Sequence, residues 1–260
     1  MKSLLTTIIF TVCGLLLSQA QDNPFAGRRI GLQFGWGKTH VQDQVIGPVN
    51  LRGGNIAIGL HYQHESKGQR RIAQFQLHNG GIAPDAKVLN TTMYKGSLSY
   101  EHLFQVSGTE DQPFAIWLGP ALRTDLQFYD FNGLSSASWK FSHSLDASAM
   151  ADYRVSDKGL LQGSLSMPMI SSVVRPPYAG FDERIDEVQS NVPALLTDRG
   201  QLNGFWDNFV IRAGIGYTHG LSDRFLASAN WQFEFQSYNQ GRNIRSFSNH
   251  IQLGIDYQLR

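Results

Sequence analysis

Several common features are scarce in this sequence, and each scarcity excludes a class of protein. One cysteine occurs among the 260 residues, at position 13, so a disulfide framework and a zinc–thiolate site are excluded. Charged residues make up 17% of the chain and the formal net charge is +1, so the concentrated basic patch of a nucleic-acid-binding protein is not expected. The mean hydropathy of −0.24 is also too polar for a bundle of transmembrane helices, each of which needs ~20 mostly apolar residues.

The N-terminus has the composition of a secretory signal peptide. Lys2 gives it a positive end, Leu4–Leu17 forms a short apolar core, and Ser18-Gln19-Ala20 places small residues at the cleavage positions. The alternative, a membrane anchor, is disfavoured because the apolar run is shorter than the ~20 residues of a spanning helix. We therefore expect residues 1–20 to be a signal peptide. The mature chain would begin at Gln21 and, because Cys13 is removed, contain no cysteine.

The most informative pattern is an alternation of apolar and polar residues, which is clearest between Asn208 and Leu259. One run in this tract has the apolar positions Phe225, Ala227, Ala229, Trp231, Phe233 and Phe235. Successive side chains of a strand point to opposite faces, and this run is as long as the ~10 residues with which a tilted strand crosses a bilayer. A soluble sandwich would bury the apolar face against a second sheet, whereas a membrane barrel turns it toward lipid. The low charge and the aromatic fraction of 12% favour the barrel.

The whole chain from 21 to 260 is predicted to be one all-β domain, a transmembrane antiparallel up-and-down β-barrel of about ten strands. The first seven strands are predicted at Arg28–Lys38, Gly53–His64, Arg70–Asn79, Thr91–Val106, Pro113–Phe128, Ala137–Arg154 and Leu160–Ser172, and the other three lie in the tract after Asn208. Connections near 67, 109, 157 and 222 are short, those near 45, 85, 132 and 188 are longer, and only the connection near 240 departs from this alternation. Such barrels have short periplasmic turns, so we expect both termini to be periplasmic.

The signal ending Ser18-Gln19-Ala20-Gln21, the girdles of aromatic residues and the amphipathic last strand resemble small outer-membrane β-barrel proteins of Gram-negative bacteria. The pattern also resembles that of the many uncharacterised, porin-like barrels of the Bacteroidota. This resemblance implies an outer-membrane location and contact with outer-membrane lipid. The chain departs from the pattern at its end, because Tyr257-Gln258-Leu259-Arg260 lacks the terminal aromatic residue that is usual in these barrels.

Charged residues recur on the inward parity of the predicted strands. They are Lys95, Glu101, Arg123, Asp125, Lys140, Asp146, Arg212, Glu234 and Asp256. An unpaired charge in a confined interior is costly, so we expect these residues to form a network of charges that fills the lumen. The alternative is that they line a narrow channel for small solutes or ions.

The segment 173–203 is the longest predicted irregular segment, and long irregular loops are usually functional or disordered. We expect it to be a long outer loop that docks a protein partner of the cell envelope. Its candidate contact residues are Arg175, Tyr178, Phe181, Val192, Leu195 and Leu196. The favoured function is therefore a non-enzymatic structural or partner-docking subunit of an envelope complex.

A lipid-modifying barrel enzyme is a third hypothesis. His64-Glu65-Ser66 has the His-x-Ser spacing of a base and a nucleophile on one strand face, and it resembles the motif of outer-membrane phospholipase A. Asn79 is the candidate third member, although the asparagine that follows the serine in that family is replaced by Lys67. His143 lies between Ser142 and Ser144, but neighbours on a strand point to opposite faces. The sequence indicates no cofactor and no metal-ligand set.

Overall fold

The computed structural model describes residues 25, 27–44, 50–84, 91–108, 112–131, 137–175, 201–239 and 243–259. The predicted signal peptide, residues 1–20, lies outside them. The strands are β1 (Gly27–Asp43), β2 (Asn50–Ser66), β3 (Gln69–Ala83), β4 (Thr91–Ser107), β5 (Phe114–Phe131), β6 (Ala137–Ser156), β7 (Gly159–Val174), β8 (Gln201–Gly204), β9 (Asn208–Gly220), β10 (Phe225–Tyr238) and β11 (Ile244–Leu259).

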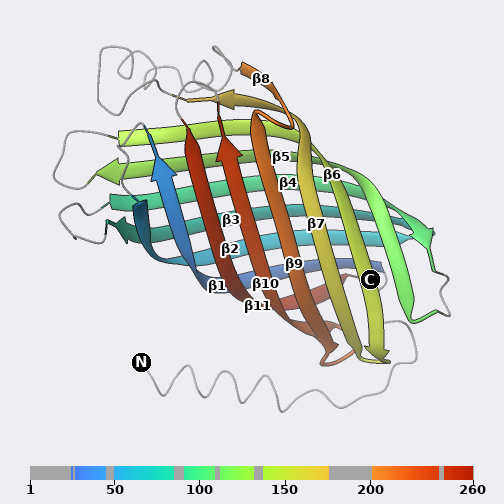
Figure 1. Ribbon diagram of the computed structural model, residues 1–260. Helices are drawn as coiled ribbons and strands as arrows, with labels where there is room; N and C mark the ends of the chain where they lie inside the picture. The colour runs from blue at the N-terminus through green and yellow to red at the C-terminus, as the bar shows by residue number, and fades with distance from the viewer. Residues whose placement is uncertain are drawn as a thin grey trace, which may run out of the picture.

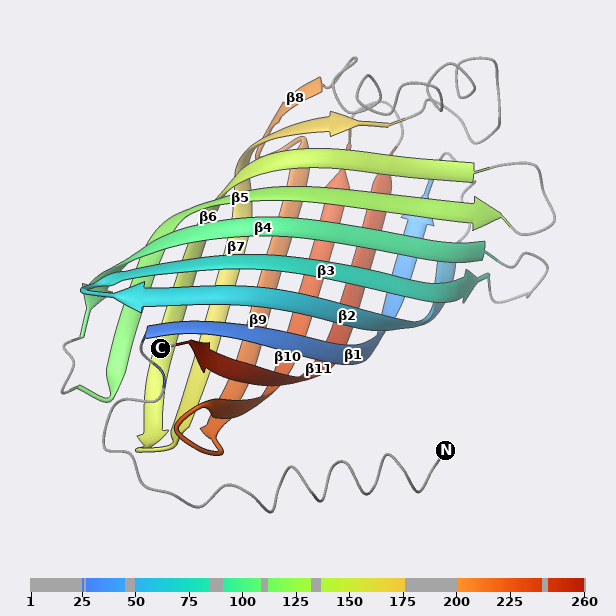
Figure 2. The same ribbon diagram turned by 180° about the vertical axis from the view of Figure 1, so that it is seen from behind.

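These strands form one closed antiparallel barrel (Figure 1). Strands β1 to β7 and β9 to β11 each pair with the next strand in sequence, β7 pairs with both β8 and β9, and the ladder between β1 and β11 closes the sheet from Arg28↔Leu259 to Asp43↔Ile244. In Figure 1, β7, β9, β10 and β11 run steeply across the near wall, the short β8 lies at its upper end, and β2 to β5 cross behind them; Figure 2 shows the reverse view. This crossing is the strand tilt that barrel closure requires.

Two of the strands share one position in the barrel wall. β8 pairs with β7 at Ile170–Val173, and β9 pairs with β7 at Gly159–Ser166. Between them is a stretch of β7 that pairs with neither β8 nor β9. It contains Pro168, which has no N–H to contribute to a ladder. Because β8 and β9 together occupy a single position, the barrel has ten strand positions, and the expected fold is confirmed.

An apolar belt covers the outside of the barrel. Leu32 is 61% exposed, whereas Gln33, the next residue along β1, is 8% exposed. The alternation continues around the wall, with the exposed residues Phe34, Trp36, Ile58, Leu60, Leu77, Leu98, Leu122, Ile215, Trp231, Leu253 and Ile255. A soluble protein would not leave so much contiguous apolar surface in water. The predicted outward parity is therefore confirmed for the strands that carry these residues.

Three sequence-based expectations need correction. The strands extend beyond their predicted ends, for example to Ala83 in β3 and Phe131 in β5, because the hydrogen-bonded ladders continue beyond the apolar belt, where alternation no longer marks them. Segment 173–203 is also not irregular at its ends, since Val173 belongs to β7 and residues 201–203 to β8. Finally, Phe141 is on the outward parity of β6 but only 6% exposed, and it packs edge-on against the His143 ring.

The two rims of the barrel differ in their connections. Lys67 and Gly68 alone join β2 to β3, with φ values of 37° and 75°. Positive φ at both central residues is the geometry of the tight hairpin turn that was predicted there. Asp157 and Lys158 alone join β6 to β7. Both turns lie at the rim where β1 begins and β11 ends. We call it the short-turn rim, and it is defined by the strand ends at Gly27, Ser66, Ser156 and Leu259. The first strand therefore starts, and the last strand finishes, at the same rim.

The apolar belt makes a prediction about charge on the outer wall. Leu253, in the middle of β11, is 52% exposed, and its replacement by arginine should lower the free energy of unfolding by about 2–4 kcal/mol. The matched variant Leu259→Arg, at the rim end of the same strand, should cost only about 0–1 kcal/mol because the penalty depends on depth in the bilayer. Urea titration in lipid vesicles measures both values. Equal costs at the two positions would contradict a lipid-facing belt.

Candidate functional site

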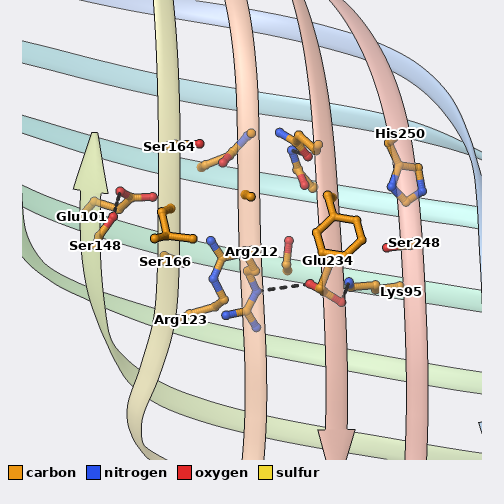
Figure 3. Close-up of a pocket in the computed structure, with 18 of the residues that line it drawn as sticks. Lys95, Glu101, Arg123, Ser148, Ser164, Ser166, Arg212, Glu234, Ser248 and His250 are labelled. Carbon is orange, nitrogen blue, oxygen red and sulfur yellow. Dashed lines mark hydrogen bonds and ion pairs between the residues drawn. The ribbon is translucent and has the colours of Figure 1, made fainter. Parts of the chain in front are cut away.

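The centre of the lumen holds a cluster of charges that come from different walls. Arg212 on β9 contacts Asp125 at 2.8 Å, Asp146 at 2.9 Å and Glu234 at 3.2 Å. Glu234 on β10 also contacts Lys95 at 2.5 Å. We call these five residues the central cluster, and Figure 3 shows Lys95, Arg212 and Glu234 converging inside the barrel. Arg212 thus forms ion pairs with three carboxylates, and Glu234 forms ion pairs with two cations.

The ion pair between Lys95 and Glu234 spans the lumen. Its strands, β4 and β10, are separated by β3, β2, β1 and β11 on one side and by β5, β6, β7 and β9 on the other. They are therefore opposite walls of the barrel. A second bridge lies nearby, where the Gln127 amide of β5 donates to Gln236 of β10 at 3.1 Å. Side chains that join opposite walls in this way cross the axis of the barrel.

The remaining predicted lumen residues lie around or away from the central cluster. Arg123 is 3.7 Å from Asp146, so it is at the edge of the cluster. Glu101 accepts a hydrogen bond from Ser148 at 2.8 Å, as Figure 3 shows. Lys140 donates to Asn208 at 3.5 Å. Of the nine predicted residues, five form the central cluster, and Asp256 belongs to a different group.

Asp256 lies near the short-turn rim. It is 3.7 Å from the Arg29 guanidinium and 3.3 Å from His61 Nε2, while Arg29 donates to Gln63 at 2.7 Å. Parity alone placed Asp256 on the same face as the central cluster. It could not give the height along the barrel at which Asp256 lies.

A further charged group was not among the predicted residues. Arg70 of β3 contacts Asp152 of β6 at 2.5 Å and Glu65 at 2.7 Å. Its guanidinium carbon lies 4.2 Å from the centre of the Trp117 ring, and the Trp117 indole N–H donates to Asp152 at 3.0 Å. The available signal was that Arg70 and Asp152 both have the inward parity of their strands. These four residues form a second charged site in the lumen.

Buried apolar side chains occupy the lumen near both rims. At the rim of the longer connections they come mainly from β1 to β5, with Val41, Leu51, Ile82, Met93, Tyr129 and Phe131 forming one group and Val173, Tyr238 and Ile244 another. At the short-turn rim, Phe25, Leu160 and Leu226 form a third group. The sequence-based analysis did not identify these apolar plugs. Apolar side chains thus narrow the polar lumen near both rims, and a cavity beside the central cluster has a volume of about 110 Å³.

The candidate catalytic residues are not brought together. His64 pairs with Arg71, and Asn79 pairs with Ile56, so Asn79 lies about 25 Å along the sheet from His64 at ~3.3 Å per residue. Ser66 is opposite Gln69 beside the tight turn. These three residues therefore do not form a catalytic triad, and Asn79 is not the third member that the lipid-modifying hypothesis needs.

Most of the predicted partner-docking residues lie outside the described residues. They are Tyr178, Phe181, Val192, Leu195 and Leu196. Arg175 is described, and it forms an ion pair with Asp43, at the end of β1. This contact ties the end of β7 to the rim of the longer connections.

No group of three or more His, Cys, Asp or Glu side chains in the described strands and turns is arranged to hold a metal ion. The described part of the chain also contains no helix that is long and apolar enough to cross a membrane.

A closed sheet with an apolar outer belt and a polar, bridged interior defines the transmembrane β-barrel class of the outer-membrane type, in which the belt contacts lipid. No protein-family model matches the sequence, and no curated protein is similar to it by sequence. Among solved structures it is similar to the outer membrane protease OmpT from Escherichia coli, with 11% identity and a TM-score of 0.49 over 94% of this chain and 99% of that one.

Two other solved barrels are similar at the same level. The translocator domain of the autotransporter NalP from Neisseria meningitidis is 10% identical with a TM-score of 0.45, and the match covers 99% of this chain and 96% of that one. Neisserial surface protein A is 9% identical with a TM-score of 0.40, covering 88% of this chain and 97% of that one. These matches have different functions in their names, so they do not specify the role of this chain.

Proposed function

We propose that this protein is a closed, non-conducting barrel of the bacterial outer membrane, and that it acts as a structural or partner-docking subunit of a cell-envelope complex. The observation that carries this proposal is the Lys95–Glu234 ion pair between opposite walls. A solute pathway along the axis would have to break this pair and the contacts of Arg212. If the barrel forms no solute pathway, its function depends on contacts made by its rims and its outer wall.

The rim of the longer connections is the docking surface in this proposal. Segment 173–203 leaves the barrel there, and its first residues are anchored by the Arg175–Asp43 pair. The apolar residues Val192, Leu195 and Leu196 would then supply contacts to a partner protein. The Bacteroidota resemblance is part of this proposal, and so is an orientation with both termini in the periplasm, which the short turns favour.

If both termini are periplasmic, cysteines at the two rims should differ in an all-or-none way in their labelling from outside the cell. In a Cys13→Ser background, Arg245→Cys lies at the rim of the longer connections and Lys158→Cys in a short turn. A membrane-impermeant maleimide should label Arg245→Cys in intact cells, and it should label Lys158→Cys only after the outer membrane is permeabilised. The reverse pattern would place the termini outside.

Gentle-detergent purification from the native outer membrane tests the docking function. The tagged protein should retain a partner at a fixed stoichiometry by quantitative mass spectrometry, and deletion of residues 178–198 should release it. Heat-modifiable migration in gels provides the control that the deleted variant still forms the barrel. Purification of the intact protein as a clean monomer would contradict the proposal, as would a partner that the deletion does not release.

A further inference from the structure

Three polar side chains occur together on the lipid-facing wall. Thr124 on β5, His143 on β6 and Ser172 on β7 are consecutive partners across the sheet. Thr124 Oγ1 lies 2.9 Å from His143 Nδ1. We call these residues the wall trio. Their neighbours on the same outward faces, Leu122 and Leu145, are 59% and 43% exposed, so the trio has the parity of the apolar belt.

The wall trio lies at a depth where water does not supply hydrogen bonds. Trp139 on β6 and Phe128 on β5 pair with each other across the sheet, and the Tyr94 ring lies tilted beside Phe128 with the ring centres 6.3 Å apart. These outward aromatic residues correspond to an interfacial girdle. His143 is four positions further along β6 than Trp139, which is about 10 Å deeper for a strand tilted by ~40°. A polar group at that depth is costly unless it has a partner.

A groove surrounds the wall trio. Its volume is about 520 Å³, and its other lining residues include Leu98, Tyr100, Leu122, Leu145 and Ile170. This is within the range of sites that take a small molecule, which combine an apolar lining with a few placed polar groups. Because the groove opens on the apolar belt, the molecule that reaches it is a membrane lipid.

The trio also presents a hydrogen-bond donor toward the groove in either tautomer of His143. If Nδ1 accepts from the Thr124 hydroxyl, then Nε2 carries the proton. If Nδ1 carries the proton and donates to Thr124, the Thr124 hydroxyl proton is available instead. Among the described residues, no side chain forms a hydrogen bond with His143 Nε2.

We propose that this groove binds a membrane lipid, with an acyl chain on the apolar lining and an oxygen atom of that chain, either an ester carbonyl or a hydroxyl, hydrogen-bonded to the wall trio. The binding site is distinct from the lumen and from the rim of the longer connections. It gives the barrel a preference among lipids that its apolar belt alone cannot provide, since the belt contacts every acyl chain in the same way.

Native mass spectrometry of the full-length mature protein tests this site. The protein would be delipidated in mild detergent and exposed to three lipids with one shared headgroup: a diester phosphatidylglycerol, its diether analogue, and an analogue with a 3-hydroxyacyl chain. The wild type should retain the diester or the hydroxyacyl lipid about 3- to 20-fold better than the diether lipid, as expected for one or two hydrogen bonds in an apolar medium. Retention of both the diester and the hydroxyacyl lipid identifies the oxygen as the ester carbonyl, and retention of the hydroxyacyl lipid alone identifies it as the hydroxyl.

Two variants show whether the preference comes from the wall trio. Thr124→Val keeps the shape of the side chain, and His143→Leu removes the ring. Each variant should retain the diester, hydroxyacyl and diether lipids about equally. The matched control is His102→Leu, because His102 is also an outward-parity histidine but does not line the groove. Heat-modifiable migration confirms that each variant is folded. Equal retention of all three lipids by the wild type, or a preference that persists in both trio variants, would overturn the proposal.

Discussion

Replacing Arg212 with methionine is expected to lower the free energy of unfolding by about 3–5 kcal/mol, the cost of removing one partner from a buried charge cluster. Arg212 contacts Asp125, Asp146 and Glu234, and no other cation comes within 4 Å of Asp125 among the described ion pairs. Asp146 is fully buried, so its charge would remain in a confined space with only the 3.7 Å contact to Arg123.

The measurement is a urea titration in lipid vesicles, monitored by tryptophan fluorescence. Arg224→Met is the matched control, because the Arg224 side chain is exposed and, among the described residues, donates only to Tyr257, at 3.5 Å. This variant should change the free energy of unfolding by no more than about 0.5 kcal/mol. The double variant Arg212→Met/Asp146→Asn should recover part of the loss, since it removes the most buried of the unpaired charges. A cost below about 1 kcal/mol, the level of an exposed ion pair, would show that Arg212 is not buried in the cluster.

Replacing Arg70 with methionine should have an effect of the same size, about 3–5 kcal/mol, at the other charged site in the lumen. The Arg70 side chain is 3% exposed and contacts both Asp152 and Glu65. The variant would also remove the stacking of the guanidinium on Trp117. Because Trp117 would lose this neighbour, its fluorescence should change in the folded state as well.

The adjacent residue provides an unusually close control for Arg70. Arg71 follows on the same strand but points outward, and its hydrogen bond to Gln69 is 3.3 Å long and exposed. Arg71→Met should change the free energy of unfolding by about 0.5 kcal/mol or less. The difference between the two variants in the free energy of unfolding therefore measures the effect of facing the lumen instead of the outside, at one place in the chain. Equal effects would contradict the assignment of Arg70 to the lumen.

The outer wall could be predicted from the sequence because a strand has a period of two. Once Leu32 and Phe34 are assigned to lipid, Gln33 must face the lumen. The same rule gave the inward direction of Arg212 and Glu234. It failed only where a local contact intervenes, as at Phe141, which has the outward parity but is covered.

The contacts inside the lumen could not be predicted, because parity specifies a face and not a height or an opposite wall. Those depend on the tilt and stagger with which ten strand positions close. Asp256 was therefore grouped with residues it does not contact, and the Arg70–Asp152 pair was missed. The apolar plugs were missed for a related reason. Near the strand ends, Val41 and Ile82 are apolar on the inward face, where the alternation argument expects polar residues.

The wall trio was missed because the search for paired hydroxyl and imidazole groups followed single strands. His143 was compared with Ser142 and Ser144, which point into the barrel. Its actual hydrogen-bond partner, Thr124, is on the neighbouring strand. The register between β5 and β6 brings them together, and the spacing of residues along one strand does not give the register between two strands.

Single-channel recording in planar bilayers tests the closed barrel most directly. The refolded wild-type protein is inserted into a membrane in concentrated KCl, with a general porin as the positive control for insertion and detection. The bridged lumen and its apolar plugs predict no unitary conductance steps from the wild type, while heat-modifiable migration shows that the inserted protein is folded. Reproducible steps of uniform size from the folded wild type would show an open axial pathway, and would contradict the closed barrel.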